Sequence, residues 1–173
     1  VSARATGKAV EGGEQDVNSV VQGFLRDRRN QRTFTGQQAR EQLERTLATD
    51  GEVPILLTTD RATGRVAVRV FNADEIVDIR TNPSDTTEPW FYLRRYQLVT
   101  YDGLNPGAPE RVECWYPALD HRPRLRPASI AGLAVRWDEP MLHVTVNGLR
   151  WWLRGIPDVY AAIDWAKAYK EFL

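Results

Sequence analysis

The sequence predicts an α+β fold, with an antiparallel, β-rich middle, amphipathic helices on the N-terminal side and a helix at the C-terminus. Three observations predict this class. Apolar residues recur at three- and four-residue steps across residues 16–50, they alternate across much of 51–154, and the helical spacing returns in 155–173. Residues 1–15 are small, polar and glycine-containing, so we expect a flexible lead-in there.

The first helix is predicted from a single apolar face. This face consists of Val17, Val20, Val21, Phe24 and Leu25. Their spacing is typical of an amphipathic helix. The basic run RDRRNQR follows, and we interpret it as a charged, solvated helix end.

The second helix carries end signals on both sides. Thr35 and Gln38 have the spacing of a capping box, and Gly51 is a typical helix stop. The helix should bury the stripe Ala39, Leu43 and Leu47.

Short strands are predicted through the middle segment. VPILLTT and RVAVRVF flank DRATG and indicate a β-hairpin, and further strands are expected at EIVDI, WFYLRRYQLVTY and RVECWYP. The proline-rich residues 117–128 predict an extended loop. The strands LAVRW and MLHVTV then lead to Asn147-Gly148, which predicts a tight hairpin with LRWWLR as its returning strand. In such a strand, Trp151 and Trp152 would point to opposite faces.

The last helix has a clear predicted start. Gly155 interrupts the preceding strand, Pro157 suits the first helical position, and Asp158 complements the helix dipole. The expected apolar stripe is Val159, Ala162, Ile163, Ala166, Tyr169 and Leu173, with Trp165 on its flank and Tyr160 and Phe172 further round. A large aromatic side chain buries about 150 to 250 Å². We therefore expect that the chain continues past this helix, or that neighbouring subunits cover its excess apolar surface.

Composition limits the function classes. The chain has 173 residues, and its 23 Lys and Arg residues balance its 23 Asp and Glu residues, so no broad positive field attracts nucleic acid or an acidic membrane. No apolar run approaches the roughly 20 residues that span a bilayer, which predicts a soluble protein. The single cysteine, Cys114, fits a reducing intracellular compartment.

Catalytic chemistry has few candidate residues. Cys114, His121 and His143 are the usual nucleophile and base types in this chain, and a Cys–His dyad is conceivable. Cys114 and His143 both lie in strand-like runs, so we interpret them as structural residues. The two histidines lack the paired spacing of a metal site. We predict no enzymatic activity, no cofactor and no metal.

The chain contains the stretches RGIPDVYAAIDWAKAYKEFL, DGEVPILLTTDRATGRVAVRVFNADEI and NPSDTTEPWFYLRRY. These three stretches resemble phage portal proteins, particularly those of the prophage and actinobacterial kind. RGIPDVYAAIDWAKAYKEFL is similar to the point where that family leaves β structure and enters a long stem helix. DGEVPILLTTDRATGRVAVRVFNADEI is similar to the family's β-hairpin and the acidic element after it, and NPSDTTEPWFYLRRY to its next strand pair. The resemblance covers roughly residues 40–173.

The resemblance implies a non-enzymatic subunit of a dodecameric ring at one capsid vertex of a virion, assembled in the cytoplasm of a bacterial host. Double-stranded DNA would pass loosely through the ring during packaging and ejection. The terminase large subunit and head-completion proteins would dock on it, with no membrane involved. This chain would be a central fragment, in which 51–154 is wing-like and clip-like and 155–173 begins a stem-like helix.

Two sets of residues are candidates for these contacts. The candidate subunit interface consists of Trp152, Tyr160, Trp165, Tyr169 and Phe172. The candidate channel or partner contacts are Arg122, Arg124, Arg126, Lys167 and Lys170. Ordinary solvation is the alternative for these basic residues.

Two other function classes stay open. One is a free-standing β-rich module that binds a ligand or nucleic acid and folds its last helix back over its sheet. The other is a small hydrolase, which requires Cys114 and His143 within about 3.5 Å of each other at the mouth of a cleft. A last helix that projects with exposed Trp or Tyr side chains favours the ring instead.

Overall fold

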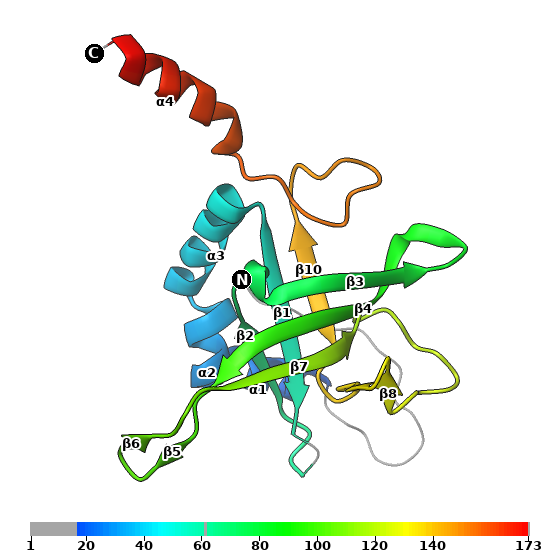
Figure 1. Ribbon diagram of the computed structural model, residues 1–173. Coiled ribbons are helices and arrows are strands. Elements are labelled where there is room, and N and C mark those ends of the chain that lie inside the picture. Colours follow the sequence, from blue (N-terminus) through cyan, green and yellow to red (C-terminus); the bar gives the residue numbers. More distant parts are fainter. Residues whose placement is uncertain (1–16, 61, 173) are drawn as a thin grey trace.

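The computed structural model describes residues 17–60 and 62–172, and it confirms the predicted α+β class (Figure 1). The helical elements are α1 (Val17–Arg26), α2 (Arg28–Asn30), the π-helical turn η1 (Gln31–Thr35), α3 (Gln37–Asp50), the 3-10 turn η2 (Ala73–Glu75) and α4 (Tyr160–Phe172). The strands are β1 (Glu52–Thr59), β2 (Val66–Val70), β3 (Ile76–Asn82), β4 (Asp85–Leu98), β5 (Tyr101–Asp102), β6 (Asn105–Pro106), β7 (Glu110–Pro117), β8 (Ser129–Ile130), β9 (Leu133–Ala134) and β10 (Met141–Thr145).

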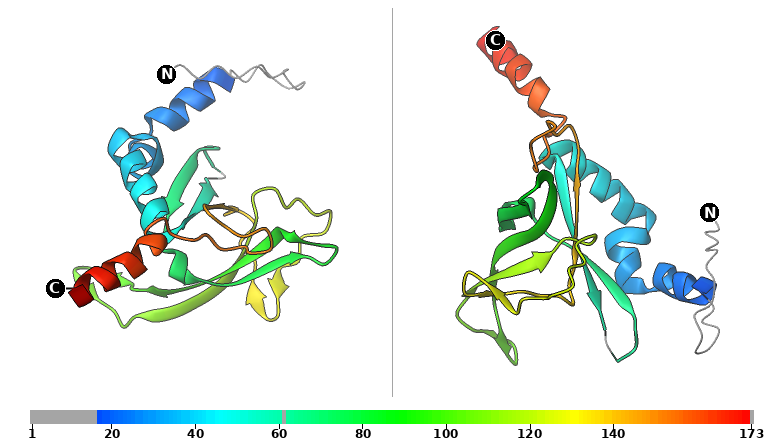
Figure 2. Two further views of the ribbon diagram at one scale, coloured as in Figure 1. Left: turned by 90° about the horizontal axis from the view of Figure 1, so that it is seen from above. Right: turned by 90° about the vertical axis from the view of Figure 1, so that its right-hand side faces the viewer.

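The strands form two three-stranded antiparallel sheets. The first has the order β10-β1-β2 and the second β3-β4-β7, while β5-β6 and β8-β9 are small hairpins. The predicted hairpin is β1-β2, in which Ile55 pairs with Val70. Figure 2 shows three layers, with α3 on one side of the first sheet and the second sheet on the other.

β1 is the central strand of the first sheet and supplies side chains to both cores. Because successive side chains of a strand point to opposite faces, Val53 and Ile55 pack with the helices while Leu56 joins the core between the sheets. The helical side of the first core includes Leu43 and Leu47, and Ala39 is also buried, so the predicted stripe of the second helix is confirmed. The second core contains Leu56, Ile76, Tyr92, Cys114, Tyr116, Ala118 and Met141.

The predicted capping box is wrong. α3 begins at Gln37 with Gly36 as its N-cap, and no side chain caps it. The π-helical turn before it ends with a hydrogen bond from Gly36 N to Gln31 O at 2.9 Å, which draws Thr35 into the preceding helical segment. The Thr35 hydroxyl therefore donates to Leu25 O at 3.3 Å. The stop at Gly51 is confirmed, since this residue has φ 79° and its N–H donates to Leu47 O.

Asn30 joins the helices to the first sheet. Its side-chain amide donates to Phe24 O at 3.2 Å and Val66 O at 2.9 Å, and its Oδ1 accepts from Val68 N at 2.9 Å. The residue is fully buried inside the run that we interpreted as solvated. Because an unsatisfied buried polar group costs about 1 to 3 kcal/mol, these three bonds select one docking of the helices on β2.

Two late predictions are corrected. Of the predicted strand LAVRW, only Leu133 and Ala134 form β9. The hairpin at Asn147-Gly148 does not form, because such a turn needs positive φ at both central residues and only Asn147 has it. The Asn147 amide instead donates to Ile156 O and to Asp158, and the predicted returning strand, residues 149–154, is a loop.

α4 begins at Tyr160, three residues after the predicted start at Pro157. The first turn after Pro157 is tighter than an α-helix, with Tyr160 N donating to Pro157 O and Ala162 N to Val159 O. These bonds span three residues, as in a 3-10 turn.

The backbones of Gly51 and Gly155 are in close contact. Gly51 lies at the corner between α3 and β1, and the segment that contains Gly155 passes this corner before it reaches α4. Val146 N donates to Gly51 O at 2.9 Å, and Ile156 N donates to Val146 O at 2.9 Å. A Cβ atom on Gly155 would lie 1.8 Å from Gly51 O. The close backbone approach therefore requires glycine at position 155.

Replacing Gly155 with alanine should lower the free energy of unfolding by at least about 2 kcal/mol, because the backbone must shift to admit the methyl group. Urea unfolding followed by tryptophan fluorescence measures this. The matched control is Gly148→Ala in the same loop, where the nearest atom to a Cβ is Arg154 O at an ordinary 3.4 Å. We expect the control to change stability by less than about 0.5 kcal/mol. Equal stability of the two variants would contradict this account of the corner.

Candidate functional site

The segment that leads into α4 is anchored by a buried carboxylate at the start of β1. Glu52 and Asn30 are the two buried polar residues in the described part of the chain. His143 Nε2, from β10, lies 3.0 Å from Glu52 Oε2, and Gly155 N donates to the same oxygen at 3.3 Å. Arg154 Nη2 lies 2.9 Å from Glu52 Oε1. One carboxylate thus joins β1, β10 and the segment before α4.

Arg154 extends this anchor to the second sheet. Its guanidinium donates to Ala73 O at 3.1 Å and to Ile76 O at 3.3 Å, at η2 and the first residue of β3. Hydrogen bonds that involve a charged group contribute about 1.5 to 3 kcal/mol, more than neutral ones. The base of α4 is therefore held by contacts to both sheets.

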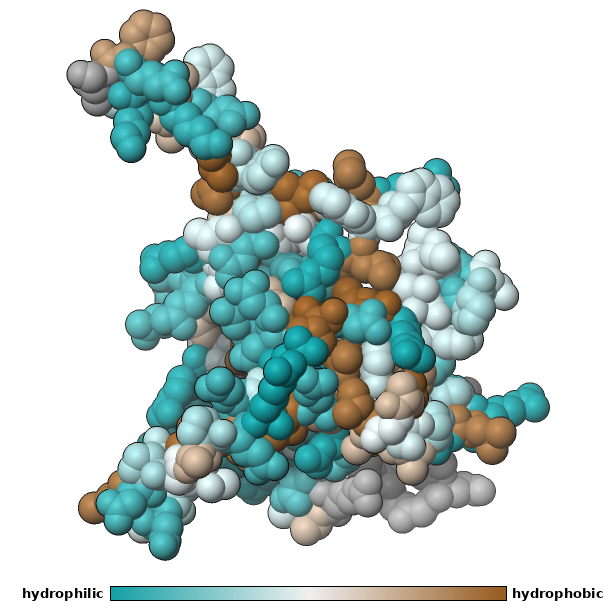
Figure 3. All heavy atoms as spheres, in the orientation of Figure 1, coloured by the Kyte–Doolittle hydropathy of each residue, from teal (hydrophilic) through white to brown (hydrophobic). Residues whose placement is uncertain are grey.

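α4 itself stands clear of the body, and none of its described residues is buried (Figure 3). All five predicted interface residues are exposed: Trp152 by 61%, Tyr160 by 67%, Trp165 by 80%, Tyr169 by 67% and Phe172 by 92%. Trp165, Tyr169 and Phe172 follow each other at four- and three-residue steps, so the helix brings them to one face. Tyr160 lies about 140° round the helix from Trp165. Trp152 lies in the loop before the helix.

The two adjacent tryptophans do not point to opposite faces of a strand as predicted. Trp151 and Trp152 lie in the loop, where Trp152 N donates to Leu149 O, and both side chains are exposed. The expected alternation fails because no strand forms there. The loop adds Leu149, Trp151 and Trp152 to the exposed apolar surface near the base of α4.

The basic candidates form two separate groups. Arg122, Arg124 and Arg126 are exposed on the predicted proline-rich loop, which lies away from α4 in both views of Figure 2. Lys167 and Lys170 are exposed on α4, with Lys167 Nζ 4.0 Å from an Asp164 carboxylate oxygen. The structure does not bring these five residues together into one basic patch.

The proline-rich loop is held on the second sheet by an aromatic cluster. The His121 ring stacks on Trp90 with 4.9 Å between ring centroids, and Phe91 meets it edge-on at 4.8 Å. The Trp137 ring is nearly parallel to the His121 ring with 6.3 Å between centroids, and the Arg126 guanidinium lies 5.4 Å from the Trp137 ring centroid. Partial burial lowers the pKa of His121, against an opposing effect of Glu88.

This lowered pKa predicts that acid weakens the loop's attachment. An unfolded histidine titrates near pH 6.5, so below that value the unfolded chain binds the proton first and stability falls. We expect the wild type to lose more stability between about pH 7.5 and about pH 5 than His121→Phe, which keeps an aromatic ring but does not titrate. Urea unfolding at both pH values measures the difference. Parallel losses in the two proteins would contradict the prediction.

The candidate catalytic side chains have structural partners. The Cys114 thiol is buried and lies 3.3 Å from the Tyr116 hydroxyl, while His143 is paired with Glu52. Cys114 is buried and the His143 side chain is only 3% exposed, whereas a Cys–His hydrolase needs both side chains at the mouth of a cleft. Within residues 17–60 and 62–172, no group of three or more His, Cys, Asp or Glu side chains could hold a metal ion.

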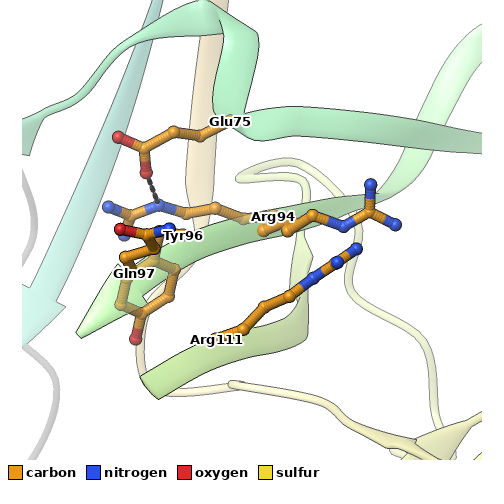
Figure 4. Close-up of a pocket in the computed structure, with 6 residues that line it drawn as sticks. Glu75, Arg94, Tyr96, Gln97 and Arg111 are labelled. Atoms are coloured by element: carbon orange, nitrogen blue, oxygen red, sulfur yellow. Dashed lines mark hydrogen bonds and ion pairs between the residues drawn. The ribbon is translucent and has the colours of Figure 1, made fainter. Parts of the chain in front are cut away.

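An arginine-lined pocket on the second sheet, formed by residues of η2, β4 and β7, was not predicted from the sequence. It has a volume of about 500 Å³ and is lined by Glu75, Arg94, Arg95, Tyr96, Gln97 and Arg111. Figure 4 shows Arg94 turned toward Glu75, whose Oε2 lies 2.7 Å from Arg94 Nε. Arg95 and Arg111 both pair with Glu113, at 2.7 and 2.9 Å, and lower its pKa. Since each of these three arginines is paired with a carboxylate, with Arg95 and Arg111 sharing Glu113, we interpret the pocket as an ion-pair network.

The sequence interpretation also missed Glu52 and Asn30. Glu52 directly precedes the strongly apolar segment VPILL, and that position was the available signal for it, whereas Asn30 lies inside the basic run RDRRNQR and has no such signal. Their partners lie far along the chain: His143 is 91 positions from Glu52, and Val68 is 38 positions from Asn30. Local periodicity contains no information about such pairs.

Comparisons with known proteins give no assignment. No family model matches the chain, and no curated protein matches it. Among the described residues, none of the helices has the length and apolar content needed to cross a membrane. The resemblance to phage portal proteins therefore rests on the quoted stretches, and the function that follows from it is a proposal.

Proposed function

We propose that this chain is part of a phage portal subunit, a non-enzymatic component of the ring through which DNA passes at a capsid vertex. The observation that carries the proposal is the exposed aromatic face of α4, formed by Trp165, Tyr169 and Phe172. The resemblance assigns this position in the chain to the start of a stem helix that lies among neighbouring subunits.

The energetics of α4 support an assembly. Transfer of apolar surface out of water contributes about 25 cal/mol per Å², and each large aromatic offers about 150 to 250 Å². Leaving three such side chains in water therefore forgoes several kcal/mol that burial against another subunit would supply. Contacts between unlike surfaces of identical subunits close into rings when the rotation between them permits it.

The charge distribution supports loose passage of DNA. Proteins that grip duplex DNA do so with several unpaired Lys or Arg side chains. Here Lys167 faces Asp164, and Arg94, Arg95 and Arg111 are paired with carboxylates. The exposed loop arginines, Arg122, Arg124 and Arg126, are the proposed docking point for the terminase large subunit or head-completion proteins.

The alternative function, a free-standing module, receives less support. It requires a last helix that covers the chain's own sheet, whereas α4 extends away from both sheets (Figure 1). The proposal accordingly assigns the chain to the virion, after assembly in the cytoplasm of the bacterial host.

The proposal predicts concentration-dependent self-association through α4. Light scattering of the 173-residue chain at low and high salt should show a mass that rises to a multiple of the single chain, and electron microscopy should show closed rings. The double variant Trp165→Ser with Tyr169→Ser should remain a single copy. Its stability should stay within about 0.5 kcal/mol of the wild type, because both side chains are exposed.

The matched control for this variant is Lys170→Ser on the same helix, which should assemble like the wild type. A single-copy mass for the wild type at every concentration and salt would refute the proposal. So would normal assembly of the double variant.

A further inference from the structure

An apolar groove lies at the end of the first sheet that is remote from α4. It has a volume of about 760 Å³ and runs between α1 and the β1-β2 hairpin. The side chains of Val20, Val21, Phe24, Leu57 and Val66 line it. Val20 is 59% exposed, and a Cβ atom on Gly23 would meet no atom within 4 Å, so this side of α1 is open.

The groove and α4 lie at opposite ends of the body. The segment leading into α4 contacts Gly51, directly before β1, whereas the groove includes the turn after β1. The eight residues of β1 separate the two, a span of about 26 Å at 3.3 Å per residue. Both views of Figure 2 show α1 and α4 well apart. A chain therefore cannot place α4 in its own groove without leaving this arrangement.

We propose that the groove is the docking site for α4 of a second copy of this chain. The inference rests on the proposed function and deepens it, because it specifies which surface of the neighbour receives the helix. A contact between α4 of one copy and the α1 groove of the next joins unlike surfaces. Such a contact propagates in one direction and builds a ring or a filament, whereas a contact between like surfaces ends at a dimer.

The anchor spacing of α4 suits a groove. Helices that bind grooves present apolar anchors at steps of three, four and seven residues. Trp165, Tyr169 and Phe172 have the steps four, three and seven. These side chains offer about 450 to 750 Å² in total. That area approaches the roughly 800 Å² that each partner buries in a typical stable interface.

The groove carries charged side chains, whereas the aromatic face of α4 carries none. Arg26 and Arg65 line the groove, and neither lies within ion-pair distance of a carboxylate in the described part of the chain. The third charged residue there, Asp27, accepts from Arg29 N as the N-cap of α2. At 100° per residue, Asp164 and Glu171 lie about 105 to 125° round α4 from the centre of the aromatic face, Lys170 lies about 130° to the other side, and Lys167 is nearly opposite that face.

The test changes the groove and the α4 helix in separate variants. Gly23→Glu blocks the groove and keeps α4 intact, and Trp165→Ser removes the central anchor and keeps the groove intact. Val20→Glu is a second groove variant at an exposed position, and Lys170→Ser is the control on α4. Circular dichroism and urea unfolding establish that each variant is folded, and light scattering gives its mass alone and in equimolar mixtures.

We expect Gly23→Glu, Val20→Glu and Trp165→Ser each to remain a single copy at concentrations where the wild type and Lys170→Ser assemble. An equimolar mixture of Gly23→Glu with Trp165→Ser should form complexes of two copies and nothing larger, because one intact helix meets one intact groove.

If both groove variants assemble like the wild type while Trp165→Ser does not, α4 packs on α4 of its neighbours. That result overturns this inference and leaves the proposed function standing. A single-copy wild type overturns both.

Discussion

The Glu52 carboxylate is the contact on which the arrangement of this chain depends. It sits between α3 and β1, accepts from the backbone of Gly155, and is paired with His143 and Arg154. Arg154 in turn bonds carbonyls at the start of the second sheet. Removing one member of a buried charged pair costs several kcal/mol, because the remaining charge loses its partner. Because any other arrangement would incur this cost, both sheets and the segment before α4 keep a single arrangement.

The direction of α4 follows from that arrangement. Gly155 crosses Gly51 so closely that no side chain fits between them, and Val159 N donates to Ala48 O at the end of α3. The segment is therefore directed past the end of the first sheet and cannot turn back over it. The aromatic face that a free-standing domain would bury remains available for another subunit. In this account the exposed surface is a consequence of a specific polar contact.

Local features could be predicted from the sequence because neighbouring residues determine them. The apolar faces of α1 and α3, the stop at Gly51 and the β1-β2 hairpin all follow from spacing within a few residues. The exposed face of α4 was also anticipated, since its aromatic residues exceed what one partner surface can cover.

The errors have one physical source: polar side chains bond partners that the local spacing does not indicate, from 9 to 103 positions away along the chain. Asn147-Gly148 has the composition of a hairpin turn, yet the Asn147 side chain bonds Ile156 and Asp158 and draws the following chain into a loop. The Thr35 hydroxyl likewise donates to Leu25 O and does not cap α3. Glu52 resembled an ordinary first residue of a strand until its partners, 91 and 103 residues away, were known. Polar residues that begin or end buried strands are the positions where such partners are best sought.

The direction of α4 can be measured with spin labels on Arg40→Cys and Ala168→Cys, at exposed positions of α3 and α4, in a dilute sample that keeps the copies apart. Cys114 is buried and does not compete for the label. If Glu52 holds the segment before α4, the distance distribution between the labels should be narrow, and Glu52→Gln should broaden it while the two sheets remain folded. A distribution of the same width in both proteins would contradict the account.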